Sequence, residues 1–273
     1  MTLARACGVV INGVEGLVVD IEAYLSQGLP GMTIVGLPDT AVGEARDRVR
    51  AAVQNSDLSW PSERRITVGL SPASVHKRGA SLDLGIALSI LAAHSQIPEM
   101  TQTIVVGELA LDGRIRSVRG VLPALIAAYK SGIKRALVSP ENYGEASLMT
   151  QMQILTFPNL AQVLRFLRTG EMTSAPQLDL EISIEEVQPD FSDVAGQTRA
   201  RFAAEVAASG GHHLLLIGPP GAGKTMIASR IPTILPALNL EQALEVTAVH
   251  SIAGTLGNRS PMSRLAPIVS PHH

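Results

Sequence analysis

A glycine-rich stretch of this chain carries residue types and spacing that suit phosphate binding. It runs from Gly218 to Thr225, fits the pattern G-x-x-x-x-G-K-[ST] and follows an apolar run at 214–217. Glycines let the backbone curl so that successive N–H groups converge on one anion. The Lys224 ammonium can reach the β- and γ-phosphates of a nucleotide, and the Thr225 hydroxyl can bind magnesium. The expected phosphate-binding residues are Gly218, Pro219, Pro220, Gly221, Ala222, Gly223, Lys224 and Thr225.

Such a loop is positioned by a strand before it and a helix after it. Residues 214–217 are expected to form a buried strand, and a helix is expected from about Gly223 to about Leu235, with its positive end toward the anion. Further helices are expected over 198–209 and 240–250, the second capped by Asn239. The alternative is a glycine-rich turn that joins a strand to a helix and binds nothing.

Composition indicates a two-domain globular protein with aliphatic cores. The chain has 273 residues, of which 46% are hydrophobic and only 3% aromatic, and its formal net charge of −2 gives no chain-wide basic surface for nucleic acid. The single Cys7 excludes an intrachain disulfide and a cysteine metal cluster, and it is expected to be a small apolar residue in a strand. The N-terminus lacks the apolar core of a signal peptide, and no run of apolar residues is long enough to span a membrane. A cytoplasmic location is therefore expected.

Charge predicts where the chain divides. Residues 171–195 contain acidic side chains but no lysine or arginine, and Pro176 and Pro189 lie among them. We expect an acidic linker over 171–190 between a domain at 1–170 and a second domain at 191–273.

Hydrophobic periodicity predicts an α/β order of elements in the first domain. Strands are expected within 9–36, and a helix is expected from Asp39 or Thr40 to Asn55. The helix over 83–93 is apolar on all sides and should be buried. The remaining expected elements are a strand at 66–70, a strand at 103–109 that pairs with 115–118, a helix at 123–130, a strand at 135–139, helices at 142–150 and 159–168, and a short strand at 154–155.

Two groups of motifs resemble one protein family. Asp193-Val194-Ala195-Gly196-Gln197 precedes the phosphate loop and resembles the start of a magnesium-chelatase-type AAA+ ATPase. The N-terminal half resembles the YifB/ComM family of chelatase-like bacterial ATPases. That second resemblance rests on Gly28-Leu29-Pro30-Gly31, Val35-Gly36-Leu37-Pro38-Asp39, Glu44-Ala45-Arg46-Asp47-Arg48-Val49-Arg50 and Val106-Gly107-Glu108-Leu109-Ala110-Leu111-Asp112-Gly113.

The resemblance implies a fold, cofactors and partners. The fold is a ribosomal-S5-domain-2-like (Lon-protease-like) α+β domain followed by part of a P-loop AAA+ α/β domain. In such proteins the segment at Val194 and Gly196 lies over the adenine, which implies ATP with magnesium as cofactors. The family works as a homo-oligomeric ring, a hexamer, without a membrane, and its ComM members act in DNA branch migration during natural transformation. The alternatives are a non-catalytic binding module with a vestigial ATPase part, and a magnesium-chelatase subunit, against which residues 1–170 weigh.

The Lon-like half raises the question of proteolysis. Lon proteases use a Ser–Lys dyad, and Ser81 falls where the resemblance places the serine. The lysine position is occupied by Pro123, which has no side-chain base, and nothing places Lys77 or Lys130 against Ser81. We therefore expect no protease activity, and we expect Ser81 to be a helix N-terminal residue.

The residues for ATP hydrolysis are incomplete. An ATPase of this type needs an acidic strand for magnesium and an arginine from a neighbour, yet the acids after Lys224 are Glu241 and Glu245 on a helix. The sequence therefore predicts a truncated ATPase module that is inactive alone, with unassigned catalytic residues. His212 and His213 lack a third metal ligand with suitable spacing. Basic groups at 46–50, 76–78 and 114–119 are interpreted as solvated faces rather than a DNA surface.

Overall fold

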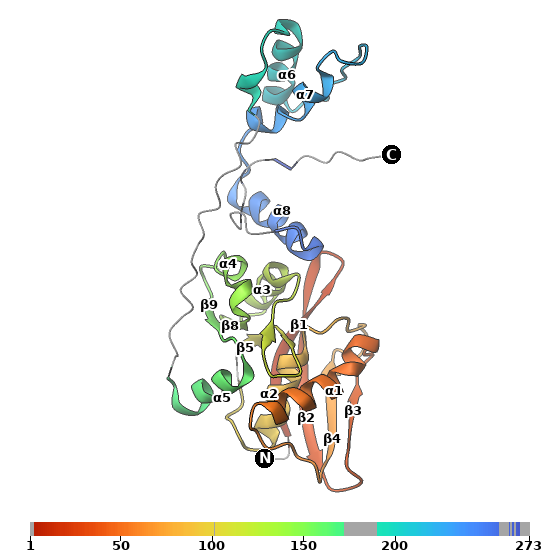
Figure 1. Ribbon diagram of the computed structural model, residues 1–273, viewed down its shortest axis with the longest axis vertical. Helices are drawn as coiled ribbons and strands as arrows, with labels where there is room; N and C mark the ends of the chain where they lie inside the picture. The colour runs from red at the N-terminus through yellow and green to blue at the C-terminus, as the bar shows by residue number, and fades with distance from the viewer. Residues whose placement is uncertain are drawn as a thin grey trace. The chain divides into compact units, whose positions relative to one another are not determined.

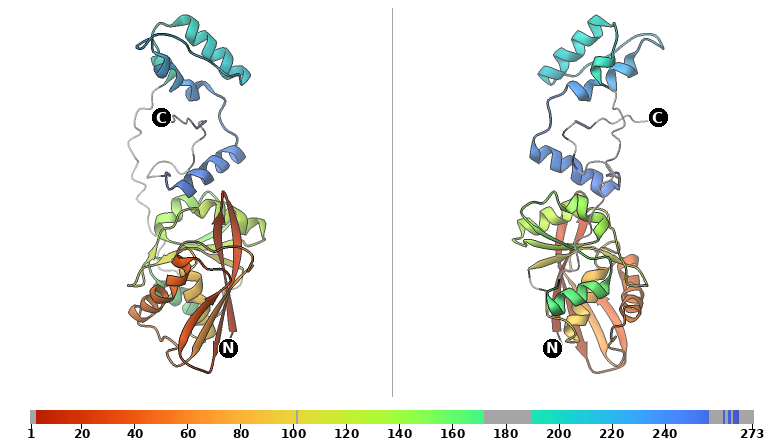
Figure 2. Two further views of the ribbon diagram at one scale, coloured as in Figure 1. Left: turned by 90° about the vertical axis from the view of Figure 1, so that its right-hand side faces the viewer. Right: turned by 60° about the vertical axis from the view of Figure 1, so that its left-hand side comes forward.

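The computed structural model of this protein describes residues 3–100, 102–171, 190–256, 262, 264, 266 and 267. Contacts divide the chain into an N-terminal unit, Met1–Leu178 with Ala248–Leu256, and a C-terminal unit, Asp179–Thr247 with Gly257–His273. Figure 1 and Figure 2 show the elements of each unit. The expected acidic linker lies outside the described residues except at its two ends, residues 171 and 190.

The N-terminal unit is built on a mixed seven-stranded sheet with the order β3-β4-β2-β1-β5-β8-β9. Its strands are β1 (Leu3–Asn12), β2 (Glu15–Ser26), β3 (Gly31–Val35), β4 (Arg65–Ser71), β5 (Thr103–Val105), β8 (Arg135–Val138) and β9 (Gln153–Thr156). A separate hairpin joins β6 (Glu108–Leu109) to β7 (Ile115–Arg116). The helices are α1 (Thr40–Asn55), α2 (Asp83–Ala93), α3 (Val121–Lys130), α4 (Tyr143–Ala146) and α5 (Leu160–Thr169).

The two long strands β1 and β2 form the centre of the sheet and can be followed in both views of Figure 2. They pair antiparallel from Leu3 opposite Tyr24 to Asn12 opposite Glu15. The connecting turn places Gly13 at φ +64°, a conformation that glycine adopts without a steric penalty. β1 then pairs parallel with β5, so this strand joins the antiparallel neighbours β2 and β4 to the parallel strands β5, β8 and β9.

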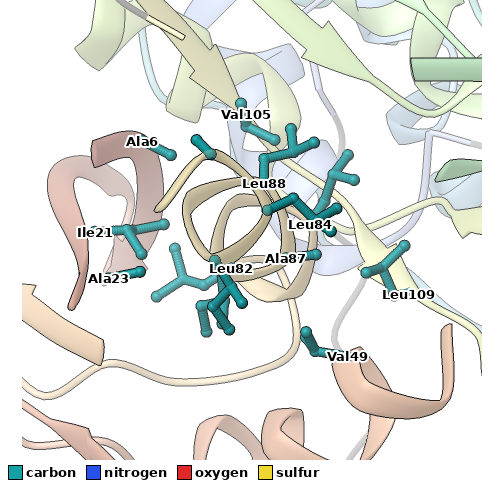
Figure 3. Packing of buried hydrophobic residues seen from close by; sticks show 14 of the residues in the cluster. Ala6, Ile21, Ala23, Val49, Leu82, Leu84, Ala87, Leu88, Val105 and Leu109 are labelled. Carbon is teal, nitrogen blue, oxygen red and sulfur yellow. The ribbon is translucent and has the colours of Figure 1, made fainter. Parts of the chain in front are cut away.

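Helix α2 lies in the middle of the hydrophobic core, and its burial confirms the sequence prediction. All of its residues from Asp83 to Ala93 are buried, because the helix is apolar around its whole circumference and must be enclosed on every side. It packs against β1 and β2, and α1 packs against α2 in turn. Figure 3 shows Ile21 and Ala23 of β2, Val49 of α1 and Leu109 of β6 placed around it.

Helix α1 also forms as the sequence predicted. Asp39 caps it, since its carboxylate accepts a hydrogen bond of 2.8 Å from the Val42 N–H. Its buried face is apolar and consists of Val42, Ala45, Val49, Ala52 and Val53. The opposite face is exposed except at Arg48, which turns toward α2.

Arg48 and Asp83 form a buried ion pair between α1 and α2. Asp83 is 1% exposed, and its two carboxylate oxygens lie 2.7 Å from Nε and 3.0 Å from Nη2 of Arg48. Burial raises the pKa of the Asp83 carboxyl, and the Arg48 guanidinium opposes that rise. The pair therefore allows the one acidic residue of α2 to stay in the core.

Replacing Arg48 by methionine should destabilise the protein strongly, because Asp83 would remain buried without its cation. We expect Arg48→Met to lower the free energy of unfolding by about 3 kcal/mol. The matched control is Arg46→Met, on the same helix, which breaks an exposed pair with Asp47 and should change stability by no more than about 0.5 kcal/mol. Urea denaturation measures both, and equal losses for the two variants would contradict a special role of the buried pair.

One expected strand is divided in two. The sequence predicted a continuous strand at 103–109, but β5 ends at Val105 and β6 begins at Glu108. Between them, the N–H of Gly107 donates to the carbonyl of Ser81, and the Gly107 carbonyl accepts from the N–H of Leu84. These bonds at the start of α2 replace the sheet bonds that a continuous strand would have made.

The face of the sheet away from α2 carries the single cysteine. Cys7 on β1 lies opposite Asp20 on β2, and its thiol donates to Oδ1 of Asp20 over 3.6 Å. Burial and the neighbouring Asp20 carboxylate raise the pKa of the Cys7 thiol to about 11. The residue lies in a strand as expected, but it is half-buried and hydrogen-bonded rather than simply apolar.

The thiol of Cys7 should therefore react slowly with electrophiles. At pH 8 we expect alkylation by iodoacetamide about a hundredfold slower than that of a free thiol, because so little thiolate is present. The rate should still be rising above pH 10, and Asp20→Asn should increase it. Mass spectrometry of time points at several pH values provides the measurement, and a rate that levels off near pH 9 would contradict the raised pKa.

The C-terminal unit is smaller and has its own apolar cluster. Its elements are the 3-10 turn Phe191–Asp193, α6 (Thr198–Gly210), α7 (Lys224–Ala228), the 3-10 turn Ile231–Ile234 and the part of α8 (Leu240–Ala253) up to Thr247. The cluster consists of Phe191, Val194, Ala204 and Ile227. Asn239 caps α8 as expected, since its side chain accepts from the Gln242 N–H at 2.9 Å.

Candidate nucleotide-binding site

The glycine-rich loop has the backbone that its sequence requires. Gly221 and Gly223 lie at φ +80° and +76°, in the left-handed region where a side chain would be strained. Helix α7 begins at Lys224, directly after the second of these glycines. The loop therefore bends twice within three residues and delivers Lys224 and Thr225 to the first turn of a helix.

Lys224 folds back over the beginning of the loop. Its Nζ donates to the carbonyls of Gly218 and Pro219, each at 2.8 Å, and these contacts lie at the surface. An ammonium held by two exposed carbonyl oxygens can exchange them for the stronger acceptors of a phosphate at little cost. Thr225 is exposed beside it. These residues therefore fit a magnesium–nucleotide phosphate.

The segment before the loop is not the expected buried strand. Residues 214–217 form no strand, and Leu215 and Ile217 are 80% and 87% exposed. Leu214 and Leu216 pack against the cluster of the C-terminal unit, so the side chains alternate as in a strand with one covered face. A strand needs a neighbour for its backbone hydrogen bonds, and no residue in the described part of the chain pairs with this segment.

The helix after the loop is also shorter than the sequence predicted. α7 ends at Ala228, and a 3-10 turn follows from Ile231 to Ile234 instead of a continuous helix to Leu235. Pro232 explains the break, because proline lacks the N–H of a helical bond and disfavours helical backbone at the preceding residue.

The segment that the resemblance places over the adenine lies beside the loop. Val194 is 0% exposed with its side chain in the apolar cluster, so only its backbone could contact a ligand. Gly196 is exposed and lies at φ +69°. The side-chain amide of Gln197 donates to the carbonyl of Ala222 at 3.0 Å, which joins this segment to the phosphate loop. The role of Val194 and Gly196 in nucleotide binding stays a prediction.

Gln197 is the site residue that sequence reasoning missed. It is the last residue of the motif that carries the resemblance, but the pattern assigns no contact to its side chain. What distinguishes Gln197 is its left-handed backbone, with φ at +51°. No periodicity in the sequence predicts that conformation.

The positions of a Lon-type dyad do not form a catalytic pair. The Ser81 hydroxyl donates to the carbonyl of Val9 at 3.3 Å, and Lys77 is 0% exposed with its ammonium on the carbonyl of Pro72. Burial lowers the pKa of Lys77. Ser81 does not start α2 as expected, because Leu82 is the N-cap residue and makes no side-chain bond to the helix. Ser81 instead connects its loop to β1.

The described residues carry neither a cluster of metal ligands nor a membrane-spanning helix. There, no group of three or more His, Cys, Asp and Glu side chains could hold a metal ion. Magnesium would therefore need the oxygens of a nucleotide together with Thr225. No helix of the described chain has the length and apolar character needed to cross a membrane.

Four arginines of the basic groups at 46–50 and 114–119 form ion pairs with acids. The ion pairs are Arg46–Asp47, Arg48–Asp83, Arg114–Asp112 and Arg116–Glu108. Lys77 is buried and cannot face a partner. The interpretation of these groups as solvated faces rather than a surface for DNA stays a prediction.

Two family models match the chain. One, described as subunit ChlI of Mg-chelatase, matches residues 21–142, and the other, described as magnesium chelatase, subunit ChlI, matches residues 190–273. The first match lies within residues 1–170, so these residues no longer weigh against the alternative of a chelatase subunit.

Several curated proteins are similar along the whole chain. An uncharacterized protein of Mycobacterium tuberculosis is 46% identical over 275 residues, covering 100% of this chain and 54% of that protein. Uncharacterized protein YifB of Escherichia coli is 41% identical over 263 residues, which are 96% of this chain and 51% of YifB. Competence protein ComM of Haemophilus influenzae is 39% identical over 279 residues, 100% of this chain and 54% of ComM.

A weaker similarity links the chain to a protease family. Lon protease of Solibacter usitatus is 22% identical over 204 residues, 71% of this chain and 25% of that protein. The mixed sheet of the N-terminal unit and these matches agree with the expected α/β fold class. The chain spans about half the length of the curated YifB and ComM relatives that it matches. With this loop geometry and 39–46% identity to YifB, ComM and the mycobacterial protein, the chain belongs to the YifB/ComM family of magnesium-chelatase-like AAA+ proteins.

Proposed function

We propose that this protein binds ATP with magnesium through residues 218–225, as part of an AAA+ ATPase of the YifB/ComM type. The observation that supports this most directly is the position of Lys224, whose ammonium donates hydrogen bonds to the exposed carbonyls of Gly218 and Pro219 at the start of the loop. Gly221 and Gly223 at positive φ add a backbone that can turn its N–H groups toward one anion.

Different residues would bind different parts of the nucleotide. The loop N–H groups and Lys224 would hold the phosphates, and Thr225 would bind magnesium together with the phosphate oxygens. The bound metal would neutralise charge on the β- and γ-phosphates. Val194 and Gly196 would contact the base through their backbone, because the Val194 side chain is buried in the apolar cluster.

We assign nucleotide binding to this stretch of chain and leave the hydrolytic residues unassigned. Glu241 and Glu245 lie exposed on α8, without the apolar strand that carries a magnesium-binding acid in such enzymes. The same proposal includes ATP turnover in a hexameric ring, in which a neighbouring subunit supplies an arginine. It also includes a cytoplasmic location and a division of the chain into domains at 1–170 and 191–273.

Replacing Lys224 by alanine should weaken ATP binding, because the point charge on the β- and γ-phosphates is lost. We expect the dissociation constant of MgATP to rise about 10- to 100-fold. Isothermal titration calorimetry measures it, with Lys130→Ala as the control, since Lys130 is an exposed lysine at the end of α3. Equal affinity of Lys224→Ala and the unchanged protein would refute the phosphate site.

Work on DNA is the finer part of the proposal, and it derives from the family resemblance. One relative carries the name competence protein, and we propose that ATP binding here is coupled to a branched DNA partner.

A specific observation favours the alternative of a non-catalytic binding module. The N-terminal unit has a closed core, whereas residues 214–217 before the phosphate loop have no strand partner in the described chain.

Nucleotide-dependent DNA binding separates the two candidates. If ATP drives work on DNA, MgATP should change the affinity of the protein for a labelled four-way DNA junction, and Lys224→Ala should remove that change. Fluorescence anisotropy at low salt provides the measurement, because contacts with DNA phosphates weaken as salt rises. A junction affinity that is the same with and without MgATP would support the binding module instead.

A further inference from the structure

Gln197 has an unusual backbone and an unusual contact. Its φ of +51° and ψ of +37° are left-handed, which costs a residue other than glycine of order 1 kcal/mol. It stands at the N-cap position of α6 but makes no capping bond with its side chain. The amide instead reaches across to the carbonyl of Ala222, which is 25 positions further along the chain.

The contact lies at the last bend of the phosphate loop. A methyl group built on Gly223 would lie 3.5 Å from Nε2 of Gln197, so the amide is in contact with the peptide between Ala222 and Gly223. Gly223, on the far side of this peptide, is the residue directly before Lys224 and Thr225. Gln197 therefore acts on the part of the loop that sets the direction of both functional side chains.

The trans geometry of a peptide explains what this bond can control. The C=O and N–H of one trans peptide point to opposite sides. When Gln197 holds the Ala222 carbonyl on its own side, the Gly223 N–H must point the other way. A flipped peptide would turn a carbonyl oxygen toward a bound phosphate in place of an N–H donor, and the partial negative charge of that oxygen would repel the phosphate.

Further contacts connect the same segment to the residues that follow α7. The N–H of Phe191 donates to Oγ1 of Thr233 at 3.1 Å, and Asp193 lies 3.6 Å from Nε of Arg230. The segment from 190 to 197 is therefore attached on both sides of α7, at Ala222 before the helix and at Arg230 and Thr233 after it.

We propose that Gln197 is a positioning residue for the phosphate loop, acting through the Ala222 carbonyl to keep the Gly223 N–H directed at the bound phosphates. The inference rests on the proposed nucleotide site and deepens it. Gln197 thus serves the phosphate end of the nucleotide, although the resemblance places its segment over the base.

The experiment compares ligands that share only the phosphates. Gln197→Gly removes the amide and also relieves the left-handed strain, so the variant should fold at least as well as the unchanged protein. It should bind MgATP, MgGTP and magnesium tripolyphosphate each about tenfold more weakly, with the preference between ATP and GTP unchanged. Gln197→Glu should weaken all three at least as much, because a carboxylate repels the Ala222 carbonyl.

Matched variants make the result decisive. Thr198→Ala changes the exposed neighbouring residue and should leave all three affinities unchanged, and thermal unfolding checks that each variant is folded. If Lys224→Ala weakens binding but Gln197→Gly stays within twofold of the unchanged protein, the positioning role is wrong. A loss confined to ATP, with tripolyphosphate unaffected, would overturn it in favour of base recognition. No effect of Lys224→Ala would overturn the nucleotide site itself and this inference with it.

Discussion

The enclosure of helix α2 is the constraint on which the N-terminal unit depends. A helix that is apolar on every side gains stability only when each side is covered, and β1, β2 and α1 supply that cover. The one acid in its first turn, Asp83, would be costly in such surroundings, and Arg48 compensates for it from α1. Two interactions therefore hold α1 in position: the packing of its apolar face and the ion pair between Arg48 and Asp83.

The elements predicted most successfully are those whose buried face follows from the hydrophobic pattern of their own residues. The face of α1 and the full burial of α2 follow from local periodicity, because each pattern has only one way to meet a core. The division of 103–109 could not be predicted, since it results from bonds between Gly107 and two residues near the start of α2 that lie more than twenty positions earlier in the chain. Hydrogen bonds of this kind depend on the tertiary fold and leave no local signal.

The same distinction holds for the candidate site. The loop residues follow from glycine, lysine and threonine at fixed spacing, whose chemistry is independent of the surroundings. The strand expected at 214–217 depends on a neighbour, and its alternating burial shows one covered face rather than two. The bond from Gln197 to Ala222 depends on a left-handed backbone, which the identity of a glutamine does not indicate. Contacts between segments, rather than motifs, were thus the unpredictable part of the site.

The bond of Ser81 to β1 has a consequence for how this fold could change during evolution. Its hydroxyl is committed to the Val9 carbonyl, and Pro123 occupies the first turn of α3, where a methyl group added to Gly16 would lie 2.7 Å from its carbonyl oxygen. A lysine at position 123 would supply an amine without releasing the hydroxyl, and a released hydroxyl would find no amine. Neither step alone would bring any benefit in hydrolysis. Peptide cleavage by a dyad of the Lon type would therefore need both changes together in this fold.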